Sequence, residues 1–312
     1  MKVHYNIQQL PAFHNAVITI GTFDGLHNGH RKIIALMQSE AAKVHGETVI
    51  ITFNPHPRQI VAKEKAPLFL INTLEEKISL LKDAHIDHLV VVPFTEAFAN
   101  QSAEQYIENF LANTFHPHTI IIGYDHRFGK GRSGDYTLLE DKQAQYNYVV
   151  KEIPVHMLEH VTISSTKIRE ALLHGDIETA KNFLGYDYFF TGTVITGNKL
   201  GCTIGYATAN LHIDDDYKLI PGNGVYAVTI NSEKAGIKDA AGMMNIGIRP
   251  TIDGTNNVIE VNIFNFDKDI YGEKLTITLK KYLRSEIKFS GLEALKEQLA
   301  KDKDAAIAAL NK

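Results

Sequence analysis

Two histidines three residues apart follow an apolar run and a glycine-rich turn. His27 and His30 come directly after the segment 21–25, Gly-Thr-Phe-Asp-Gly, and Gly29 lies between them. A helix beginning here would place both imidazoles about one turn apart, beside unpaired backbone N–H groups that favour an anion. Because Gly29 has no Cβ, a ligand could approach the backbone closely. The pattern predicts a nucleoside triphosphate site, with these further contacts: Gly21, Thr22, Phe23 and Asp24.

Two other interpretations of the histidine pair are a metal site and an exposed helix start with incidental histidines. Zinc needs a third and usually a fourth ligand, and the only cysteine, Cys202, is far away in the sequence. The strand and the glycine turn before the pair disfavour an incidental origin. No G-x-x-x-x-G-K-[ST] string occurs, so the chain is not a P-loop enzyme, and no G-x-G-x-x-G follows a strand.

Further polar segments also follow expected strands. They are 54–57, Asn-Pro-His-Pro, and the segment that begins at Gly123 and continues into the glycine-rich stretch 129–134. That stretch is either a cationic lid over the triphosphate or a solvated turn. Segment 163–169 puts hydroxyls and cations at a helix start, which suits a second phosphate contact or a capped surface helix. The phosphate-binding residues predicted there are Ser164, Ser165, Thr166 and Arg169.

Several phosphate-binding segments without an obvious base suggest a substrate that brings its own anionic nucleophile. Transfer of a nucleotidyl group to a phosphate fits, because catalysis then needs alignment and charge stabilisation. His27 and His30 would donate hydrogen bonds to the charge that develops on the pyrophosphate leaving group. Mg²⁺ would bridge ATP oxygens while it keeps most of its waters.

The elements that position these residues alternate between apolar strands and helices up to about residue 155. Continuous apolar strands separated by helices predict a parallel sheet covered on both faces, with ligands beyond the carboxyl ends of the strands. Capping boxes predict helix starts at Thr73 with Glu76 and at Ser102 with Gln105. Strands are expected at 16–20, 48–53, 88–93, 119–123 and 147–153, and helices near 30–45, 73–84, 102–113 and 136–144.

After Leu184 the pattern changes to closely spaced short strands, which suggest a closed antiparallel barrel. A last helix, capped by Ser290 with Glu293, would pack on it, and the helical pattern 166–183 would link the two parts. The expected fold is α/β: a doubly wound, Rossmann-like domain over 1–184 and a barrel domain over 185–312. The barrel strands are expected at 189–196, 203–211, 224–231, 243–248, 258–266 and 274–283.

Length and composition set broader limits. The 312 residues suffice for two domains, and a formal net charge of −4 argues against a nucleic-acid partner or an anionic membrane surface. One cysteine excludes an internal disulfide and fits a reducing compartment. The N-terminus lacks an apolar signal region, and the longest apolar runs are too short to span a membrane. We expect a cytoplasmic protein that is a monomer or a weak homo-oligomer and that acts on small molecules.

Four strings in the first domain carry a close resemblance. G-T-F-D-G-x-H-x-G-H, N-P-H-P, G-Y-D-H-R-F-G and I-S-S-T-K-I-R, in this order, resemble the adenylyltransferase module of bacterial bifunctional riboflavin kinase/FMN adenylyltransferases, also called bifunctional FAD synthetases. The H-x-G-H element alone is shared with other nucleotidylyltransferases. On this resemblance ATP is the co-substrate, riboflavin, FMN and FAD are substrates and products, and these residues bind the flavin: Asn54, His56, Pro57, Asp125 and Arg127.

The barrel segment resembles the riboflavin kinase module of the same family. Alternation puts Glu260 and Asn262 on the face opposite Ile259, Val261 and Ile263, and a kinase hydroxyl substrate benefits from a carboxylate base. The resemblance implies that Glu260 is this base and that Thr208 and Asn210 supply oxygens to Mg²⁺. It also implies ATP contacts from Gly192, Gly197, Lys199, Gly201, Thr208 and Asn210, and flavin contacts from Tyr226, Arg249, Arg284 and Glu286.

The chain departs from the family pattern at three positions. Ala207 stands where P-T-A-N begins with proline, Asn262 replaces the usual histidine, and Cys202 stands where arginine is common. Magnesium binding should survive, because the Thr208 and Asn210 oxygens are kept, whereas the backbone lacks the conformation that proline would pre-set. Two rival functions remain: a nucleotidylyltransferase for another phosphorylated acceptor with an accessory barrel, and a non-enzymatic flavin- or nucleic-acid-binding regulator.

Overall fold

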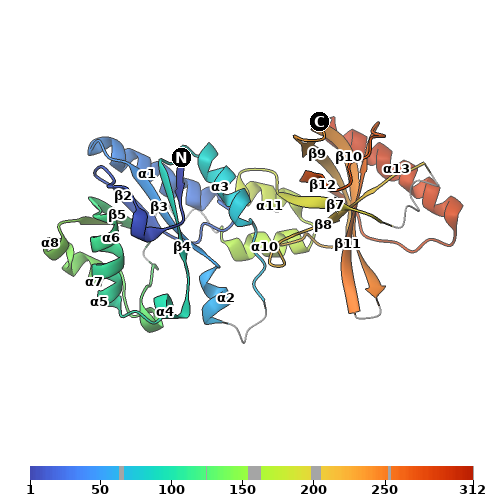
Figure 1. Cartoon of the computed structure of the whole chain (residues 1–312). Helices are drawn as coiled ribbons and strands as arrows, with labels where there is room; N and C mark the ends of the chain where they lie inside the picture. The colour runs from blue at the N-terminus through green and yellow to red at the C-terminus, as the bar shows by residue number, and fades with distance from the viewer. Residues whose placement is uncertain (63–66, 124, 154–162, 198–204, 252–253, 312) are drawn as a thin grey trace. The chain divides into compact units, whose positions relative to one another are not determined.

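The chain forms two compact units, Met1–Ser164 and Ser165–Lys312 (Figure 1). The computed structural model describes residues 1–62, 67–123, 125–153, 163–197, 205–251 and 254–311, without the side chains of 249–251 and 254–257. The predicted domain boundary lies after Leu184, whereas the two helices before this residue group with the second unit. They are α10 (Ser165–Leu173) and α11 (Ile177–Leu184).

The first unit contains a six-stranded sheet in the order β1-β4-β3-β2-β5-β6, and every neighbouring pair is parallel. The predicted Rossmann-like architecture is therefore confirmed. The strands are β1 (Lys2–His4), β2 (Val17–Ile20), β3 (Thr48–Asn54), β4 (His88–Pro93), β5 (Thr119–Ile122) and β6 (Val149–Glu152). The helices are α1 (Asn28–Lys43), α2 (Pro57–Val61), α3 (Leu74–Asp83), α4 (Glu96–Ala99), α5 (Ala103–Gln105), a π-helical segment (Tyr106–Ala112), α6 (Asn113–Phe115), α7 (Tyr136–Asp141) and α8 (Gln143–Tyr146), with short 3₁₀ turns at Ile7–Gln9 and Lys130–Arg132.

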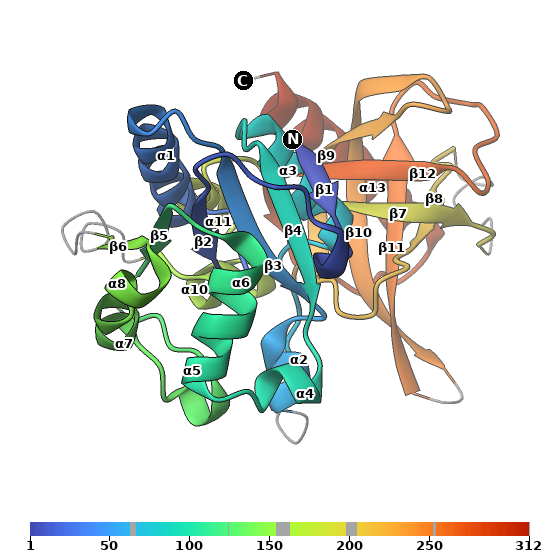
Figure 2. The ribbon, with the colours of Figure 1, turned by 60° about the vertical axis from the view of Figure 1, so that its left-hand side comes forward.

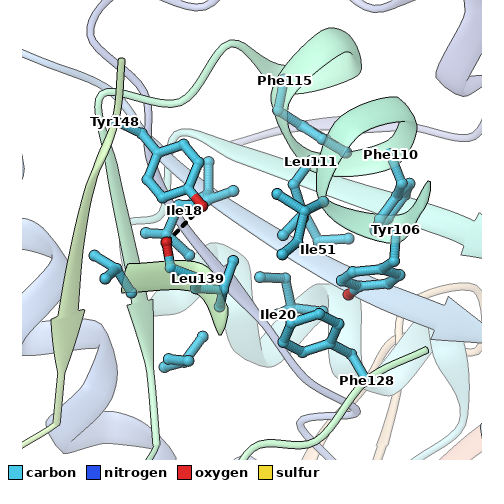
Figure 3. Close-up of a cluster of buried hydrophobic side chains, with 14 of the residues drawn as sticks. Ile18, Ile20, Ile51, Tyr106, Phe110, Leu111, Phe115, Phe128, Leu139 and Tyr148 are labelled. Atoms are coloured by element: carbon cyan, nitrogen blue, oxygen red, sulfur yellow. Dashed lines mark hydrogen bonds between the residues drawn. The ribbon is translucent and has the colours of Figure 1, made fainter. Parts of the chain in front are cut away.

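Successive residues of the central strands are buried on opposite faces of this sheet, which explains their continuous apolar runs. Ile18 and Ile51 belong to the cluster on the face covered by α5 and the π-helical segment (Figures 2 and 3). Val17 and Ile50 belong to the cluster on the other face, with α1 and α3. In the first cluster the Tyr148 hydroxyl also donates a 2.8 Å hydrogen bond to a backbone carbonyl oxygen.

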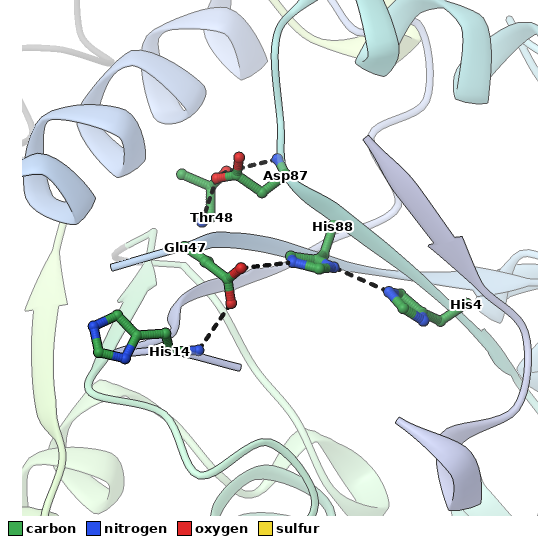
Figure 4. Close-up of polar contacts among 6 residues, drawn as sticks. All are labelled: His4, His14, Glu47, Thr48, Asp87 and His88. Atoms are coloured by element: carbon green, nitrogen blue, oxygen red, sulfur yellow. Dashed lines mark hydrogen bonds and ion pairs between the residues drawn. The ribbon is translucent and has the colours of Figure 1, made fainter. Parts of the chain in front are cut away.

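The edge strand β1 was not predicted, and a polar cluster joins its end to β4 (Figure 4). His4 Nε2 lies 3.0 Å from His88 Nδ1, and His88 Nε2 lies 3.3 Å from a Glu47 carboxylate oxygen. Beside them Asp87 accepts from the backbone and hydroxyl of Thr48, and the Thr48 hydroxyl accepts from the Asp87 backbone. Contacts between distant residues therefore secure this short strand.

Both predicted capping boxes of the first unit are confirmed. The Thr73 hydroxyl accepts from the Glu76 backbone at 3.2 Å while Glu76 accepts from Thr73, and Ser102 and Gln105 form the same reciprocal pair. The cap proposed for the last helix is wrong, because α13 (Leu292–Leu310) has Gly291 as its N-cap residue and no side-chain capping bond.

The second unit is a closed antiparallel barrel, as predicted, and its strand order is β10-β11-β8-β7-β12-β9. Tyr226, Met244 and Ile259 are buried and alternate with residues on the outer face, where Ala306 of α13 packs against Ala227. The strand expected at 203–211 is shorter, and residues 203–204 lie outside the described part. The strands are β7 (Phe189–Ile195), β8 (Ala209–His212), β9 (Gly224–Ser232), β10 (Ile237–Thr251), β11 (Gly254–Ile263) and β12 (Lys274–Arg284).

Candidate nucleotide and flavin sites

The histidine pair lies at the carboxyl edge of the parallel sheet, where α1 begins. Strands β2 and β5 are neighbours from which the chain proceeds in opposite directions, so their carboxyl ends form a topological switch point. His27 is the N-cap residue of α1, and its Nδ1 accepts from the His30 backbone N–H at 3.4 Å. The two imidazoles are stacked, with ring centroids 3.8 Å apart. The fold therefore brings the predicted pair to the position where doubly wound sheets bind ligands.

Burial keeps both imidazoles neutral near pH 7. It lowers the pKa of His27 to about 4, against an opposing effect of Asp24, and His27 is only 8% exposed. Burial, assisted by His27 and Lys77, holds the pKa of His30 well below 6.5. Because His27 Nδ1 accepts a hydrogen bond, its proton belongs on Nε2, which is then a donor. His30 Nδ1 is buried and has no hydrogen-bond partner within the described part of the chain.

The turn before the histidines has a tightly constrained backbone. Phe23 and Leu26 have φ values of 48° and 34°, and the Leu26 N–H donates to the Phe23 carbonyl oxygen at 3.3 Å. A Cβ on Gly21 would lie 3.1 Å from the Phe23 ring. The Asp24 carboxylate is buried and accepts from the Ile71 and Asn72 backbones at 2.9 and 3.2 Å. Asp24 thus ties this turn to the segment before α3.

Two further segments predicted for this site follow neighbouring strands at the same edge of the sheet. Asn54 ends β3 and His56 is the N-cap residue of α2, with its Nδ1 3.1 Å from the Arg58 backbone N. The peptide between Asn54 and Pro55 is cis, and Pro57 is the first residue of α2. Parallel strands end on one edge, so this segment shares that edge with the histidine pair.

The segment after β5 contains the other predicted flavin-binding residues of this unit. Asp125 and Arg127 are exposed, and Arg127 lies 3.4 Å from the Asp135 carboxylate. Burial lowers the pKa of His126 to about 4, and its Nε2 has no hydrogen-bond partner among the described residues. Phe128 and Gly134 exchange backbone hydrogen bonds of 3.1 and 2.9 Å. The glycine-rich stretch is therefore a closed turn in this structure.

The second predicted phosphate segment falls at the boundary of the two units. Ser164 ends the first unit, whereas Ser165, Thr166 and Arg169 belong to α10 in the second. Proximity of these three residues to His27 stays a prediction.

On the outer face of the barrel, three polar residues form a row across neighbouring strands. Glu260 of β11 pairs with Asn210 of β8 on one side and with Asn245 of β10 on the other. Directly paired residues of antiparallel strands point to the same face, so the three side chains lie together, opposite the buried Ile259. Asn245 was not assigned a role from the sequence, and its pairing with Glu260 is a long-range contact.

The loop that precedes β8 lies next to this row. Gly197 approaches the Asn210 amide so closely that a Cβ there would collide with it. Thr208 lies two residues before Asn210, while Lys199 and Gly201 lie outside the described residues. Gly192 lies within β7. A Cβ at this position would lie 2.9 Å from the side chain of Ile213, the residue that follows β8.

Two departures from the family pattern contact each other. The Asn262 amide donates a 2.7 Å hydrogen bond to the Ala207 carbonyl oxygen. This bond ties the segment before Thr208 to β11. It therefore restrains the backbone at a position where the family pattern has a proline.

Of the four flavin-binding residues predicted in the barrel, two have structural contacts instead. Tyr226 is fully buried inside the barrel, and its hydroxyl donates to the Gly222 carbonyl oxygen. Arg284 makes two hydrogen bonds to Asp302 of α13, at 2.8 and 2.6 Å. Direct flavin contact by either residue is therefore disfavoured in this arrangement.

The other two predicted flavin residues differ from these. Glu286 is exposed, and a Cβ added to Gly247 would collide with its carboxylate. The same Cβ would lie 3.3 Å from the Asn245 amide nitrogen, so the Glu286 carboxylate lies near Asn245 and the polar row. The Arg249 side chain lies outside the described part of the structure.

The described residues contain neither a candidate metal-binding cluster nor a candidate membrane-spanning helix. No group of three or more His, Cys, Asp or Glu side chains there could hold a metal ion. Among these residues, no helix is both long and apolar enough to cross a membrane.

Comparison with known families supports both units. An FAD synthetase family model matches residues 10–167, and a riboflavin kinase family model matches residues 184–310. The matched ranges leave most of α10 and α11 between them. They agree with the parallel sheet in the first unit and the closed barrel in the second.

Curated relatives match nearly the whole chain. Proteins named bifunctional riboflavin kinase/FMN adenylyltransferase are 36% identical in Haemophilus influenzae, covering 98% of this chain and all of the relative, and 36% identical in Bacillus subtilis, covering 97% and 95%. A crystal structure from Streptococcus pneumoniae, described as a macrolide-efflux protein, has a TM-score of 0.84 at 28% identity and covers 98% of both chains.

These matches confirm the resemblance, the fold class and the two predicted activities, and they give no support to the two rival functions. The first unit has the architecture and the histidine pair expected of an adenylyltransferase, and the second has the barrel with its polar row. This chain belongs to the family of bifunctional riboflavin kinases/FMN adenylyltransferases.

Proposed function

We propose that the two units catalyse consecutive reactions at separate ATP sites. The barrel transfers the γ-phosphoryl group of ATP to riboflavin, which gives FMN and ADP. The first unit transfers the adenylyl group of ATP to FMN, which gives FAD and pyrophosphate. The observation that carries the second assignment is the stacked, neutral His27–His30 pair at the start of α1, on the ligand edge of the parallel sheet.

In adenylyl transfer, a phosphate oxygen of FMN attacks the α-phosphorus of ATP and the bond to pyrophosphate breaks. The attacking oxygen is already anionic, so no protein base is needed. His27 Nε2–H donates to the oxygen on which charge develops, and α1 directs its free N–H groups to the same phosphates. Asn54, His56 and Asp125 then orient the flavin from the same edge of the sheet, with Arg127.

In riboflavin phosphorylation, Glu260 accepts the proton of the ribityl 5′-hydroxyl as its oxygen attacks the γ-phosphorus. Asn210 and Asn245, the direct cross-strand partners of Glu260, fix the position of Glu260 on the face of the barrel. The side-chain oxygens of Thr208 and Asn210, with the Glu260 carboxylate nearby, are hard donors that suit Mg²⁺. When bound, Mg²⁺ supplies charge neutralisation to the phosphate oxygens.

The test incubates the full chain with ATP, Mg²⁺ and riboflavin or FMN, and separates the flavins by chromatography. Glu260→Gln should abolish FMN formation while FAD formation from added FMN continues. His27→Asn, which replaces the Nδ1 acceptor of the helix cap by an amide oxygen, should make FMN accumulate. Glu233→Gln and His45→Asn, at exposed positions, are the matched controls. Loss of both activities from either single substitution would contradict two independent sites.

The remaining inferences concern the setting of the enzyme. We infer a cytoplasmic location from the single cysteine, and no nucleic-acid partner from the net charge. A monomer or weak homo-oligomer is proposed, and size-exclusion chromatography with light scattering tests it.

A further inference from the structure

Lys77 is a buried cation in the first unit that the proposed mechanism does not use. It lies in the first turn of α3 and is only 6% exposed. Its backbone N–H donates to the Thr73 carbonyl oxygen at 3.0 Å, but its ammonium group makes no hydrogen bond or ion pair with any residue that the structure describes. Buried ammonium groups are normally paired, because burial without a partner is costly.

The surroundings of Lys77 make this position more unfavourable for a cation. The N-terminal turn of a helix carries a partial positive charge, and burial lowers the pKa of Lys77. Asp24 is the one group that opposes this effect on the pKa. Its carboxylate already accepts hydrogen bonds from two backbone N–H groups, those of Ile71 and Asn72. Asp24 is therefore a counter-charge that Lys77 shares with these two backbone donors.

The position of Lys77 relates its ammonium group to the histidine pair. The positive charge of Lys77 contributes to the low pKa of His30, so the ammonium group lies within electrostatic reach of this imidazole. Helices α1 and α3 pack on the same face of the sheet, through Ile34, Met37 and Leu81. Asp24, which also interacts with Lys77, belongs to the turn that leads into His27.

We propose that Lys77 binds the β- and γ-phosphate oxygens of ATP, and pyrophosphate after the transfer. This assignment rests on the proposed adenylyltransferase site. Lys77 stays protonated throughout and donates hydrogen bonds to non-transferred oxygens, so it neutralises the leaving group without moving a proton. The alternative is that Lys77 only balances the charge of Asp24.

The experiment compares Lys77→Met and Lys77→Arg with Lys82→Met, an exposed lysine on the same helix. It measures KM for ATP and for FMN in FAD formation, and the affinity of the full chain for inorganic pyrophosphate. Loss of a charged hydrogen bond predicts that Lys77→Met weakens pyrophosphate binding about 10- to 100-fold and raises KM for ATP similarly. KM for FMN should stay near that of the parent, and Lys77→Arg should recover part of the loss.

A pyrophosphate affinity of Lys77→Met within about twofold of the Lys82→Met control would overturn the proposal. If Lys77→Met does not fold, Lys77→Arg still tests it: pyrophosphate binding should persist to higher pH in the arginine variant than in the parent, and coincident pH profiles would overturn the assignment. His27→Asn serves as the reference in the same assay. An inactive His27→Asn with an unaffected Lys77→Met rejects only the role of Lys77, whereas an active His27→Asn rejects the histidine site.

Discussion

His27 should make the first unit sensitive to acid, by an amount that its burial determines. Its pKa is about 4 in the folded protein, whereas the pKa of an exposed histidine is 6.5. Since the folded pKa is the lower one, the unfolded chain binds more protons between these values. The contribution of the neutral His27 imidazole to the free energy of unfolding is complete above pH 6.5 and is lost as pH falls toward 4. It amounts to about 3 kcal/mol over the whole range, of which about 2 kcal/mol is already lost at pH 5.

His27→Asn isolates this contribution. Asparagine does not titrate and can still accept the capping hydrogen bond at the start of α1, so the helix cap is retained. Urea unfolding at pH 7.5 and 5.0, followed by pulse proteolysis with detection of first-unit peptides, gives the free energy of unfolding at each pH. The parent should lose about 2 kcal/mol more than the variant on acidification.

The exposed His45→Asn should retain the pH dependence of the parent. Equal losses in the parent and in His27→Asn would refute the reasoning, because they would show that the His27 imidazole titrates alike in the folded and unfolded states.

Three further outcomes are expected. Arg284→Met should lower the free energy of unfolding of the barrel by about 3 kcal/mol, because it leaves the buried Asp302 carboxylate without its paired cation. Thermal unfolding measures this loss, and the double variant Arg284→Met with Asp302→Leu should recover stability relative to Arg284→Met alone. Tyr148→Phe should cost about 1 kcal/mol in urea unfolding of the first unit, since one buried hydrogen bond to a carbonyl is lost, and no loss would contradict the contact. Gly247→Ala should displace Glu286 and raise KM for riboflavin about tenfold in the kinase assay, with FAD formation from FMN as the unaffected control.

The sequence predicts the central strands well because both faces of the parallel sheet are buried. Val17–Ile20 and His88–Pro93 are apolar runs whose alternate residues enter different clusters, so their signal is strong. β1 has only three residues, and contacts with β4 and the His4–His88 pair secure it. Nothing within such a short polar segment indicates these distant partners.

The candidate site is predictable to the extent that its residues are local in sequence. His27 and His30 are one helical turn apart, and their pairing follows from spacing. Tyr226 and Arg284 illustrate the limit, because the face that a strand residue occupies depends on register. The pairing of β12 with β9 shifts between Leu279 and Lys281 and again before Arg284, and no sequence pattern marks these shifts.

The open edges of the first sheet have a consequence for self-association. In the closed barrel every strand has a partner on both sides. The open sheet of the first unit instead ends in two edge strands, whose outer backbone groups could pair with another chain. Here those ends are β1, with three residues, and β6, with four, and they carry Lys2 and Lys151. Short, charged margins of this kind discourage strand-to-strand aggregation, so substitutions that lengthen β6 or remove its lysine should be the ones that promote precipitation.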